Sequence, residues 1–320
     1  METFWTKLPK PFFVLAPMAD VTDAAFRRII ARYGKPDVTW TEFVSADGLA
    51  SPGREVLKYD LMYTEGERPI VAQLFSSHIE QMRIASKLCA ELGFDGIDIN
   101  MGCPDKSIEK QGAGAAMMKN MKNAGEIIQA VKDGIKDAGK DIPVSVKTRV
   151  GYNKVQIDEW IPFLLSQDLA ALTIHARTRK EMSLVPARWE HVKEVVEIRD
   201  KMGVKTKIIG NGDVRDIAHG RVLAEQTGCD GIMIGRGIFG NPWLFSERIP
   251  SLKEKLEVMV EHTKLFEELL GGVKNFAIMK KHYKAYVNGF DGAKELRVKL
   301  MEANSVEEIE SIVKEFLNNS

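Results

Sequence analysis

The chain has 320 residues, of which 44% are hydrophobic and 28% are charged, and its formal net charge is zero. These values are typical of a globular protein and exclude one that is basic over its whole surface, so any nucleic-acid-binding surface has to be local. No apolar run approaches the roughly 18 residues of a membrane span, and the N-terminus has no signal-peptide pattern, so we expect a cytoplasmic protein with no membrane partner. The three cysteines form no C-x-x-C pair, so we expect no disulfide framework and no metal site.

Eight short apolar runs between residues 12 and 235 are predicted strands, and segments with helical spacing separate most of them. The runs are apolar rather than strictly alternating, which is typical of parallel strands buried on both faces. Their number and order favour a (β/α)8 TIM barrel. A doubly wound open sheet is the alternative, but no G-x-G-x-x-G motif opens the first helix. The expected strands span residues 12–16, 38–44, 70–75, 96–100, 144–149, 171–177, 207–211 and 231–235, and the expected helices span 24–33, 79–92, 114–137, 156–167, 189–202 and 215–226, with a polar connection at 54–66.

The strand pattern stops after residue 250. Helical spacing then covers residues 251–270, 276–287 and 293–316, with glycine-containing breaks between these segments. We therefore expect two domains, a TIM barrel over residues 1–248 and a small helical domain over residues 249–320.

Cys103 follows the fourth run in a turn between Gly102 and Pro104. A lone cysteine is often a small buried hydrophobe, and Cys89, on an apolar helix face, is interpreted in this way. The turn instead places Cys103 just beyond the C-terminal end of a strand, where functional residues of such barrels gather. Small residues at 111–116 let the backbone approach a flat ligand closely.

Polar residues also stand at the C-terminal ends of several expected strands. They are Gln73, Asn100, Lys147, Arg149, His175, Arg177 and Asn211. Each also has a structural interpretation, such as a core hydrogen bond for Gln73 or His175 and a side chain that reaches solvent for Lys147. Asp213 is expected chiefly to cap the helix that follows it.

Two pairs of residues, Asn211-Gly212 and Gly235-Arg236, follow the seventh and eighth strands. TIM barrels often bind phosphate at this place, and these pairs supply open backbone N–H groups and a cation. With Lys147 to stabilise the negative charge of a reduced flavin and Cys103 to donate a proton, they indicate a flat, phosphate-bearing cofactor. Spacing alone does not distinguish a flavin from another phosphorylated ligand.

Six motifs in chain order resemble those of the tRNA-dihydrouridine synthases. They are A-P-M-A-D-V-T-D at 16–23, N-M-G-C-P at 100–104, K-T-R at 147–149, H-A-R-T at 175–178, G-N-G-D-V at 210–214 and M-I-G-R-G at 233–237. The resemblance runs from residue 11 to residue 245 and continues more weakly through 282–286 and 292–297. One stretch departs from it: the family often has a Tyr-x-Gly stretch before Ala-x-Trp, whereas residues 182–189 read M-S-L-V-P-A-R-W, so we expect a reshaped loop there.

The resemblance implies an FMN enzyme that reduces the C5–C6 bond of specific uridines in tRNA, with NADPH as reductant and no obligate protein partner evident. By family analogy, hydride goes from reduced FMN to C6, and Cys103 protonates C5. Asn100 and Arg177 are expected to hold the uracil edge or a nearby nucleotide. The resemblance implies that the cofactor is lined by Pro17, Met18, Ala19, Gln73, Lys147, His175, Asn211, Gly212, Asp213, Gly235 and Arg236.

Basic residues cluster between residues 272 and 300, at Lys274, Lys280, Lys281, Lys284, Lys294, Arg297 and Lys299. A solvated helix face is the structural interpretation. Given the resemblance, we expect this region to hold tRNA through Lys280, Lys284 and Arg297, and we expect Tyr283 and Tyr286 to stack on bases or ribose.

Three other functions remain as alternatives. An FMN barrel that acts on a free pyrimidine, like the dihydroorotate dehydrogenases, explains the cysteine and the flavin contacts but not the basic helical tail. A phosphate-sugar lyase or isomerase with a Schiff base at Lys147 needs no flavin. The third is a catalytically inactive RNA-binding protein, and the presence of Cys103 together with the full set of expected cofactor contacts argues against it.

Overall fold

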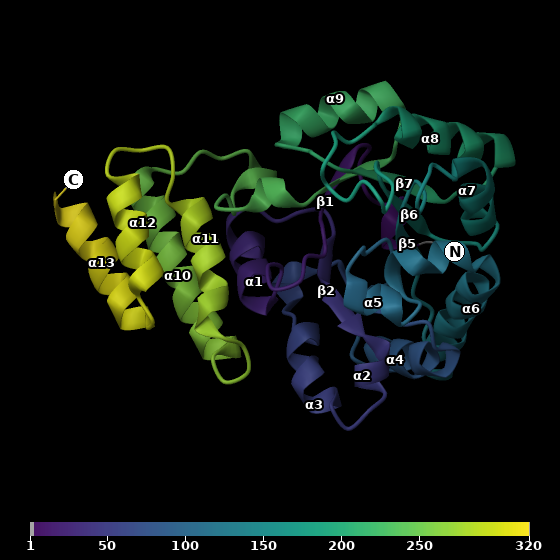
Figure 1. Ribbon diagram of the computed structural model, residues 1–320, viewed down its shortest axis with the longest axis horizontal. Coiled ribbons are helices and arrows are strands. Elements are labelled where there is room, and N and C mark those ends of the chain that lie inside the picture. Colours follow the sequence, from purple (N-terminus) through teal and green to yellow (C-terminus); the bar gives the residue numbers. More distant parts are fainter. Residues whose placement is uncertain (1–2, 320) are drawn as a thin grey trace.

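The computed structural model describes residues 3–319, and within them eight parallel strands form one sheet that closes into a barrel (Figure 1). The strand order is β1-β8-β7-β6-β5-β4-β3-β2. A parallel bridge between Val14 and Val38 closes the ring, and the backbone N–H of Asp37 donates to the carbonyl of Phe13 at 2.8 Å. The predicted TIM barrel is therefore confirmed. Its strands are β1 Phe12–Leu15, β2 Thr39–Ser45, β3 Ile70–Phe75, β4 Gly96–Met101, β5 Val144–Arg149, β6 Ala171–His175, β7 Lys207–Asn211 and β8 Gly231–Ile234.

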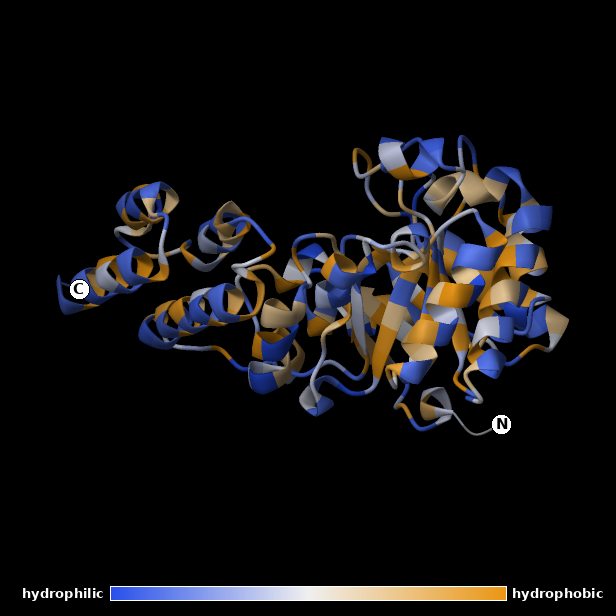
Figure 2. Cartoon of the chain, turned by 90° about the horizontal axis from the view of Figure 1, so that it is seen from below, coloured by the Kyte–Doolittle hydropathy of each residue, from blue (hydrophilic) through white to orange (hydrophobic). Residues whose placement is uncertain are grey.

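Helices surround the sheet, and hydrophobic residues lie mainly on the strands and on the inward helix faces (Figures 1 and 2). The first helix begins as expected, because Asp23 accepts a hydrogen bond from the backbone N–H of Phe26 at 2.9 Å. Cys89 is fully buried, as expected of a core residue. The helices of this part are α1 Ala24–Tyr33, α2 Ala46–Leu49, α3 Arg54–Leu57, α4 Ile79–Glu91, α5 Lys106–Lys110, α6 Met121–Asp137, α7 Ile157–Leu165, α8 Glu190–Met202 and α9 Ile217–Thr227.

Two of the predicted segments of the barrel part differ from their predictions. The expected helix over 114–137 is split into a 3-10 helix, Gly114–Lys119, and α6. The break lies at Asn120, whose backbone is not helical, with a φ of −140° and a ψ of 78°, and whose side chain caps α6 by accepting from the backbone N–H of Asn123 at 3.1 Å. The polar connection at 54–66 contains α3 and two short 3-10 helices, Lys58–Leu61 and Glu65–Glu67.

One end of the barrel is filled with aromatic side chains. Trp5 lies 5.7 Å from Phe12 and 5.9 Å from Trp40, measured between ring centroids, and these two residues stand near the N-terminal ends of β1 and β2. Because bulky rings pack this end, the mouth formed by the C-terminal strand ends is the place for a ligand.

The chain ends in α10 Leu252–Leu270, α11 Met279–Tyr286, α12 Ala293–Glu302 and α13 Val306–Asn319, which lie beside α1 (Figure 1). The expected single helix over 293–316 is wrong. Ala303 has extended backbone, and the next helix starts with a new cap in which Ser305 accepts from the backbone N–H of Glu308, and Glu308 accepts from the backbone N–H of Asn304. These paired caps satisfy orphan N–H groups at a helix start, which favours the break.

The C-terminal helices have their own apolar cluster, which also includes Ala25 of α1. They contact the barrel closely: Phe26 stacks on His262 at 4.9 Å between centroids, and a Cβ atom on Gly240 would lie 2.1 Å from the carbonyl oxygen of Ala285. The division at residue 248 therefore remains a prediction. Within residues 3–319, no helix is long and apolar enough to cross a membrane.

Candidate active site

The turn that carries Cys103 is fixed from both sides. The side-chain oxygen of Asn100, near the end of β4, accepts from the backbone N–H groups of Gly102 at 3.1 Å and Cys103 at 2.9 Å. The backbone N–H of Ala115 donates to the carbonyl of Cys103 at 2.9 Å. Gly114 is required at this approach, because it has a φ of +59° and a Cβ atom there would lie 2.7 Å from that carbonyl oxygen.

The thiol of Cys103 is suited to donate a proton. The side chain is partly exposed, whereas Cys89 and Cys229 are buried. Burial raises the pKa of Cys103, although the backbone N–H of Asp105 and the charges of Arg149 and Lys147 oppose that rise. The group therefore stays a thiol at neutral pH, and the two cations beside it stabilise the thiolate that remains once the proton has left.

A buried polar chain supports this turn from within the barrel. Asp98 of β4 accepts from the Ser145 hydroxyl at 2.5 Å and from the Gln73 amide at 2.6 Å, and burial raises the pKa of Asp98 to about 6. Gln73 in turn accepts from the side-chain amide of Asn100 at 3.1 Å. Sequence reasoning named neither Asp98 nor Ser145; the available signal was a carboxylate inside an apolar strand, which needs buried partners. Gln73 makes the core hydrogen bonds of its structural interpretation, and its contact with a cofactor stays a prediction.

Lys147 spans the barrel mouth rather than reaching solvent. Its ammonium donates to the side-chain oxygen of Asn211 at 3.2 Å, and the Asn211 amide donates to the carbonyl of Met233 at 2.9 Å. Burial, with a smaller contribution from Arg149, lowers the pKa of Lys147 to about 8, so the group is mostly protonated at neutral pH. Arg149 itself donates to the carbonyl of Gly102 at 2.8 Å and so holds the turn before Cys103.

His175 and Arg177 lie together at the end of β6. Arg177 approaches Nε2 of His175 at 3.1 Å, and since a guanidinium only donates, the neutral ring carries its hydrogen on Nδ1. Burial, followed by the charges of Arg149 and Lys147, lowers the pKa of His175 far below its usual value. The other donors of Arg177 contact the Val185 carbonyl at 2.6 Å and Asp213. Its side chain is only 3% exposed, so a contact of Arg177 with uracil stays a prediction.

The expected helix cap at Asp213 is wrong. The cap of α9 is Asp216, which accepts from the backbone N–H of His219 at 2.7 Å. Asp213 instead bridges two arginines, because it pairs with Arg177 and accepts from Arg236 at 2.8 Å. It also accepts from the backbone N–H of Ala187 at 2.9 Å, which fixes the loop over residues 182–188 to the site.

The loops after β7 and β8 fit a phosphate group. Gly212 has a φ of +127°, and a Cβ atom there would lie 2.8 Å from the Cβ of Ala187. Within the described residues, the backbone N–H groups of Gly212, Gly235 and Arg236 donate to no other part of the chain. The Arg236 side chain is exposed beside them. Open amides with a guanidinium are the donors that bind phosphate oxygens.

The loop between β1 and α1 faces the loop after β8. Pro17 is buried, Met18 is partly buried and Ala19 is exposed. A Cβ atom on Gly235 would lie 3.6 Å from the sulfur of Met18, which is ordinary contact distance. The structure thus brings the expected cofactor residues together at one barrel mouth.

The expected tRNA contacts lie on the C-terminal helices instead. Lys280 and Lys284 belong to α11, with Lys284 exposed, whereas Arg297 of α12 donates to the carbonyl of Val287 at 2.7 Å. The stacking expected for Tyr283 and Tyr286 is wrong, because both side chains are fully buried in the apolar cluster of α10–α13. An aromatic ring next to lysines in sequence faces the opposite side of a helix when it fills the apolar stripe.

Comparisons with known proteins agree with this geometry. A family model described as "Dihydrouridine synthase (Dus)" matches residues 14–320. The "Probable tRNA-dihydrouridine synthase 2" of Bacillus subtilis (strain 168) is 43% identical over 321 residues, which covers 98% of this chain and 97% of that protein. The "Probable tRNA-dihydrouridine synthase" of Staphylococcus aureus (strain MRSA252) is 41% identical over 320 residues, which covers 98% and 96%.

Solved structures show a similar fold at low sequence identity. A 2-naphthoyl-CoA reductase complex has a TM-score of 0.53 at 11% identity and covers 73% of this chain and 49% of that chain. A morphinone reductase in complex with tetrahydroNAD has a TM-score of 0.50 at 12% identity and covers 76% and 89%. At these identities the likeness concerns the barrel alone. The family model and the two full-length relatives match in sequence over nearly the whole chain, and they establish that this chain belongs to the dihydrouridine synthase family.

Proposed function

We propose that this protein is a flavin-dependent tRNA-dihydrouridine synthase that binds FMN at the barrel mouth and reduces the C5–C6 bond of a tRNA uridine. The observation that carries the proposal is the protonated thiol of Cys103 on the same mouth as Lys147 and the glycine-rich phosphate cradle. The family supplies the substrate class, and the donor set supports a phosphate-bearing flavin.

Three groups of residues bind and orient the cofactor. The amides of Gly212 and Gly235 and the guanidinium of Arg236 would hold the phosphate, and Lys147 would supply positive charge to a reduced flavin. The chemistry that FMN would supply when bound and reduced by NADPH is a hydride for C6 of the uracil. Met18 contacts the opposite loop and closes the cradle on one side.

Cys103 completes the reduction by donating the proton from Sγ to C5 of the uracil. One hydride and one proton add across the C5–C6 double bond, so the electrons and atoms balance. The resulting thiolate is stabilised by the charges of Arg149 and Lys147 and regains a proton from solvent, because the side chain is partly exposed.

The tRNA is held mainly outside the barrel, through Lys280 and Lys284 of α11. A target uridine has to leave its stack to reach the mouth, which costs a few kcal/mol. Phosphate contacts along the tRNA offset that cost, and free uridine cannot make them.

The test is a reconstitution with purified full-length protein, FMN, NADPH and unmodified tRNA. We expect a yellow protein that forms dihydrouridine in tRNA, measured by nuclease digestion and mass spectrometry, and leaves free uridine unreacted. A protein that stays colourless after incubation with FMN contradicts the cofactor, and reduction of free uridine at the same rate as tRNA favours the free-pyrimidine alternative.

A further inference from the structure

Lys274 connects the C-terminal helices to the barrel. It follows α10, and its backbone N–H donates to the carbonyl of Leu270 at 2.7 Å. Its ammonium lies 2.7 Å from Glu42 and 2.8 Å from Asp60. The side chain is only 14% exposed and that of Glu42 only 6%, so this contact is shielded from solvent, unlike an ordinary surface ion pair.

Glu42 links Lys274 to the loop between β1 and α1, which lines the expected cofactor site. While one carboxylate oxygen accepts from Lys274, the other accepts from the backbone N–H of Asp20 at 2.5 Å. Asp20 has a φ of +53°, a left-handed conformation that a side chain disfavours unless its surroundings hold it. Asp20 follows directly on Met18 and Ala19, so the Glu42 contact fixes the end of the cofactor-lining segment.

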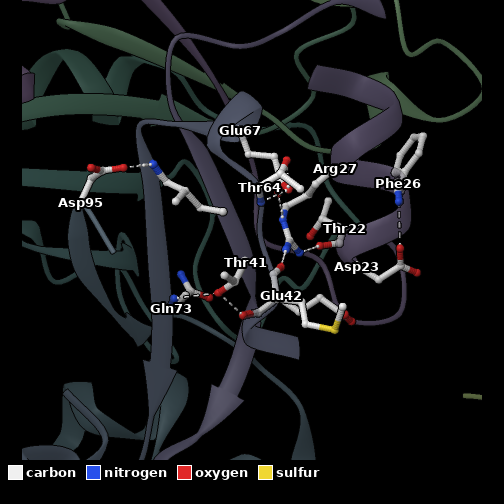
Figure 3. Close-up of polar contacts among 12 residues, drawn as sticks. Thr22, Asp23, Phe26, Arg27, Thr41, Glu42, Thr64, Glu67, Gln73 and Asp95 are labelled. Carbon is white, nitrogen blue, oxygen red and sulfur yellow. Dashed lines mark hydrogen bonds and ion pairs between the residues drawn. The ribbon is translucent and has the colours of Figure 1, made fainter. Parts of the chain in front are cut away.

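A second attachment holds the same loop through Arg27 of α1. The backbone N–H of Met18 donates to the Thr22 hydroxyl at 2.9 Å, and Arg27 donates to the Thr22 carbonyl at 2.6 Å. Arg27 is paired with the fully buried Glu67 at 2.8 Å (Figure 3). The loop over residues 17–23 is therefore held at Thr22 by Arg27 of α1 and at Asp20 by Glu42, which contacts Lys274 just after α10.

Several negative charges surround Glu42, and Lys274 offsets them. Asp20 and Asp23 of the β1–α1 loop and Asp60 of the β2–β3 connection all face this region, and Lys274 is the cation that contacts Glu42. Without it, the carboxylate of Glu42, which is only 6% exposed, lies near other carboxylates with little solvent to screen it.

We propose that Lys274 is a positioning residue for cofactor binding: through Glu42 it holds the β1–α1 loop, and with it Met18, in the conformation that lines the site. This inference rests on the proposed function. It gives the C-terminal helices a part in flavin affinity in addition to their part in tRNA binding.

The test is a double-mutant cycle on FMN affinity, with Lys274→Met, Glu42→Gln and the double variant in full-length protein freed of flavin. Affinity is measured by the quenching of FMN fluorescence, and thermal unfolding shows that each variant is folded. Each single variant is expected to bind FMN about tenfold more weakly, and the double variant no more weakly than the weaker single one, because coupled contacts are not additive. The matched control is Lys264→Met, which removes a lysine of α10 that pairs with Glu310 at 2.8 Å with both side chains about half exposed; its affinity should equal that of the wild type.

A pH series separates positioning from a general loss of structure. Burial raises the pKa of Glu42 to about 7, although Lys274 opposes that rise and Asp60 and Asp23 add to it. As pH falls from 8 to 6, wild-type protein should therefore lose FMN affinity as Glu42 takes up a proton. The FMN phosphate titrates near pH 6 in every variant, so the difference between wild type and Glu42→Gln isolates Glu42.

The outcomes distinguish failure of the positioning role of Lys274 from failure of the proposed function. Wild-type affinity in folded Lys274→Met, or fully additive effects in the cycle, overturns the positioning role. If Lys274→Met does not fold, Glu42→Gln carries the test, and wild-type affinity with an unchanged pH profile in that variant overturns the role as well. Wild-type protein that binds no FMN contradicts the proposed function itself, before any variant is compared.

Discussion

The side-chain oxygen of Asn100 accepts hydrogen bonds from two successive backbone N–H groups, and the second is that of Cys103 at 2.9 Å. The position of the thiol is therefore set by a side chain inside the barrel, which Gln73 holds in turn. This relationship predicts that Asn100 affects catalysis through the backbone that positions Cys103, apart from any contact with the uracil.

Asn100→Ala should lower both stability and turnover. It leaves buried N–H groups without an acceptor, which costs about 1–3 kcal/mol of unfolding free energy for each unpaired group. Urea unfolding measures the loss, and single-turnover reduction of tRNA measures the effect on the Cys103 turn. Asn318→Ala, an exposed substitution on α13, is the control and should change neither quantity.

Cys103→Ala should separate the two halves of the reaction. The variant should bind FMN and oxidise NADPH like wild type, while reduction of tRNA slows about 10²–10⁴-fold, the usual contribution of a general acid. Cys89→Ala and Cys229→Ala remove buried side chains, so they should cost stability but leave the tRNA rate of the folded enzyme unchanged. Full tRNA turnover by Cys103→Ala contradicts the assignment.

The lowered pKa of Lys147 predicts a loss of activity as the pH rises above neutral. Burial lowers its pKa to about 8, so the ammonium is present below that pH and is lost as pH rises through it. The tRNA-reduction rate should therefore fall above pH 8 when substrate and NADPH are saturating. Lys147→Arg keeps its charge at higher pH, so whatever rate it retains should lack this alkaline limb; an identical limb in that variant assigns the titration to another group.

Gly212→Ala should distort the phosphate cradle and weaken FMN binding. The new Cβ atom would lie 2.8 Å from that of Ala187, and the φ of +127° is strained for alanine by about 1–3 kcal/mol. Gly203→Ala is a matched control, because it also has a positive φ, of +68°, but nothing lies within 4 Å of its Cβ position. FMN titration should show weakened binding only for Gly212→Ala, with both variants less stable than wild type.

Reversing two charges on α11, with Lys280→Glu and Lys284→Glu together, should weaken tRNA binding and flatten its dependence on salt. Each lost phosphate contact lowers the slope of log affinity against log salt by about 1. FMN affinity and NADPH oxidation should stay at wild-type values. Lys253→Glu with Lys314→Glu, at exposed positions on α10 and α13, changes the net charge equally, and an equal loss of tRNA affinity in that variant argues against a specific surface on α11.

Local sequence determined the strands, most of the helices and the set of residues at the barrel mouth. Apolar runs separated by helical spacing predicted the strands within one or two residues, because burial on both faces leaves a pattern that short segments display by themselves. Polar residues at the strand ends, such as Lys147 and Asn211, came together because parallel strands present their C-terminal ends on one edge. The six motifs then predicted the family, which the comparisons confirmed.

Only the tertiary structure decided which partners these side chains have. Lys274 is one of seven basic residues in its stretch, but it turns back onto Glu42 of β2, more than two hundred positions away in the sequence. Tyr283 and Tyr286 stand among lysines in sequence, yet both are buried against α10 and its neighbours. Sequence spacing shows which residues share a helix face but not what packs on that face, because burial and ion pairing depend on contacts between segments that are distant along the chain.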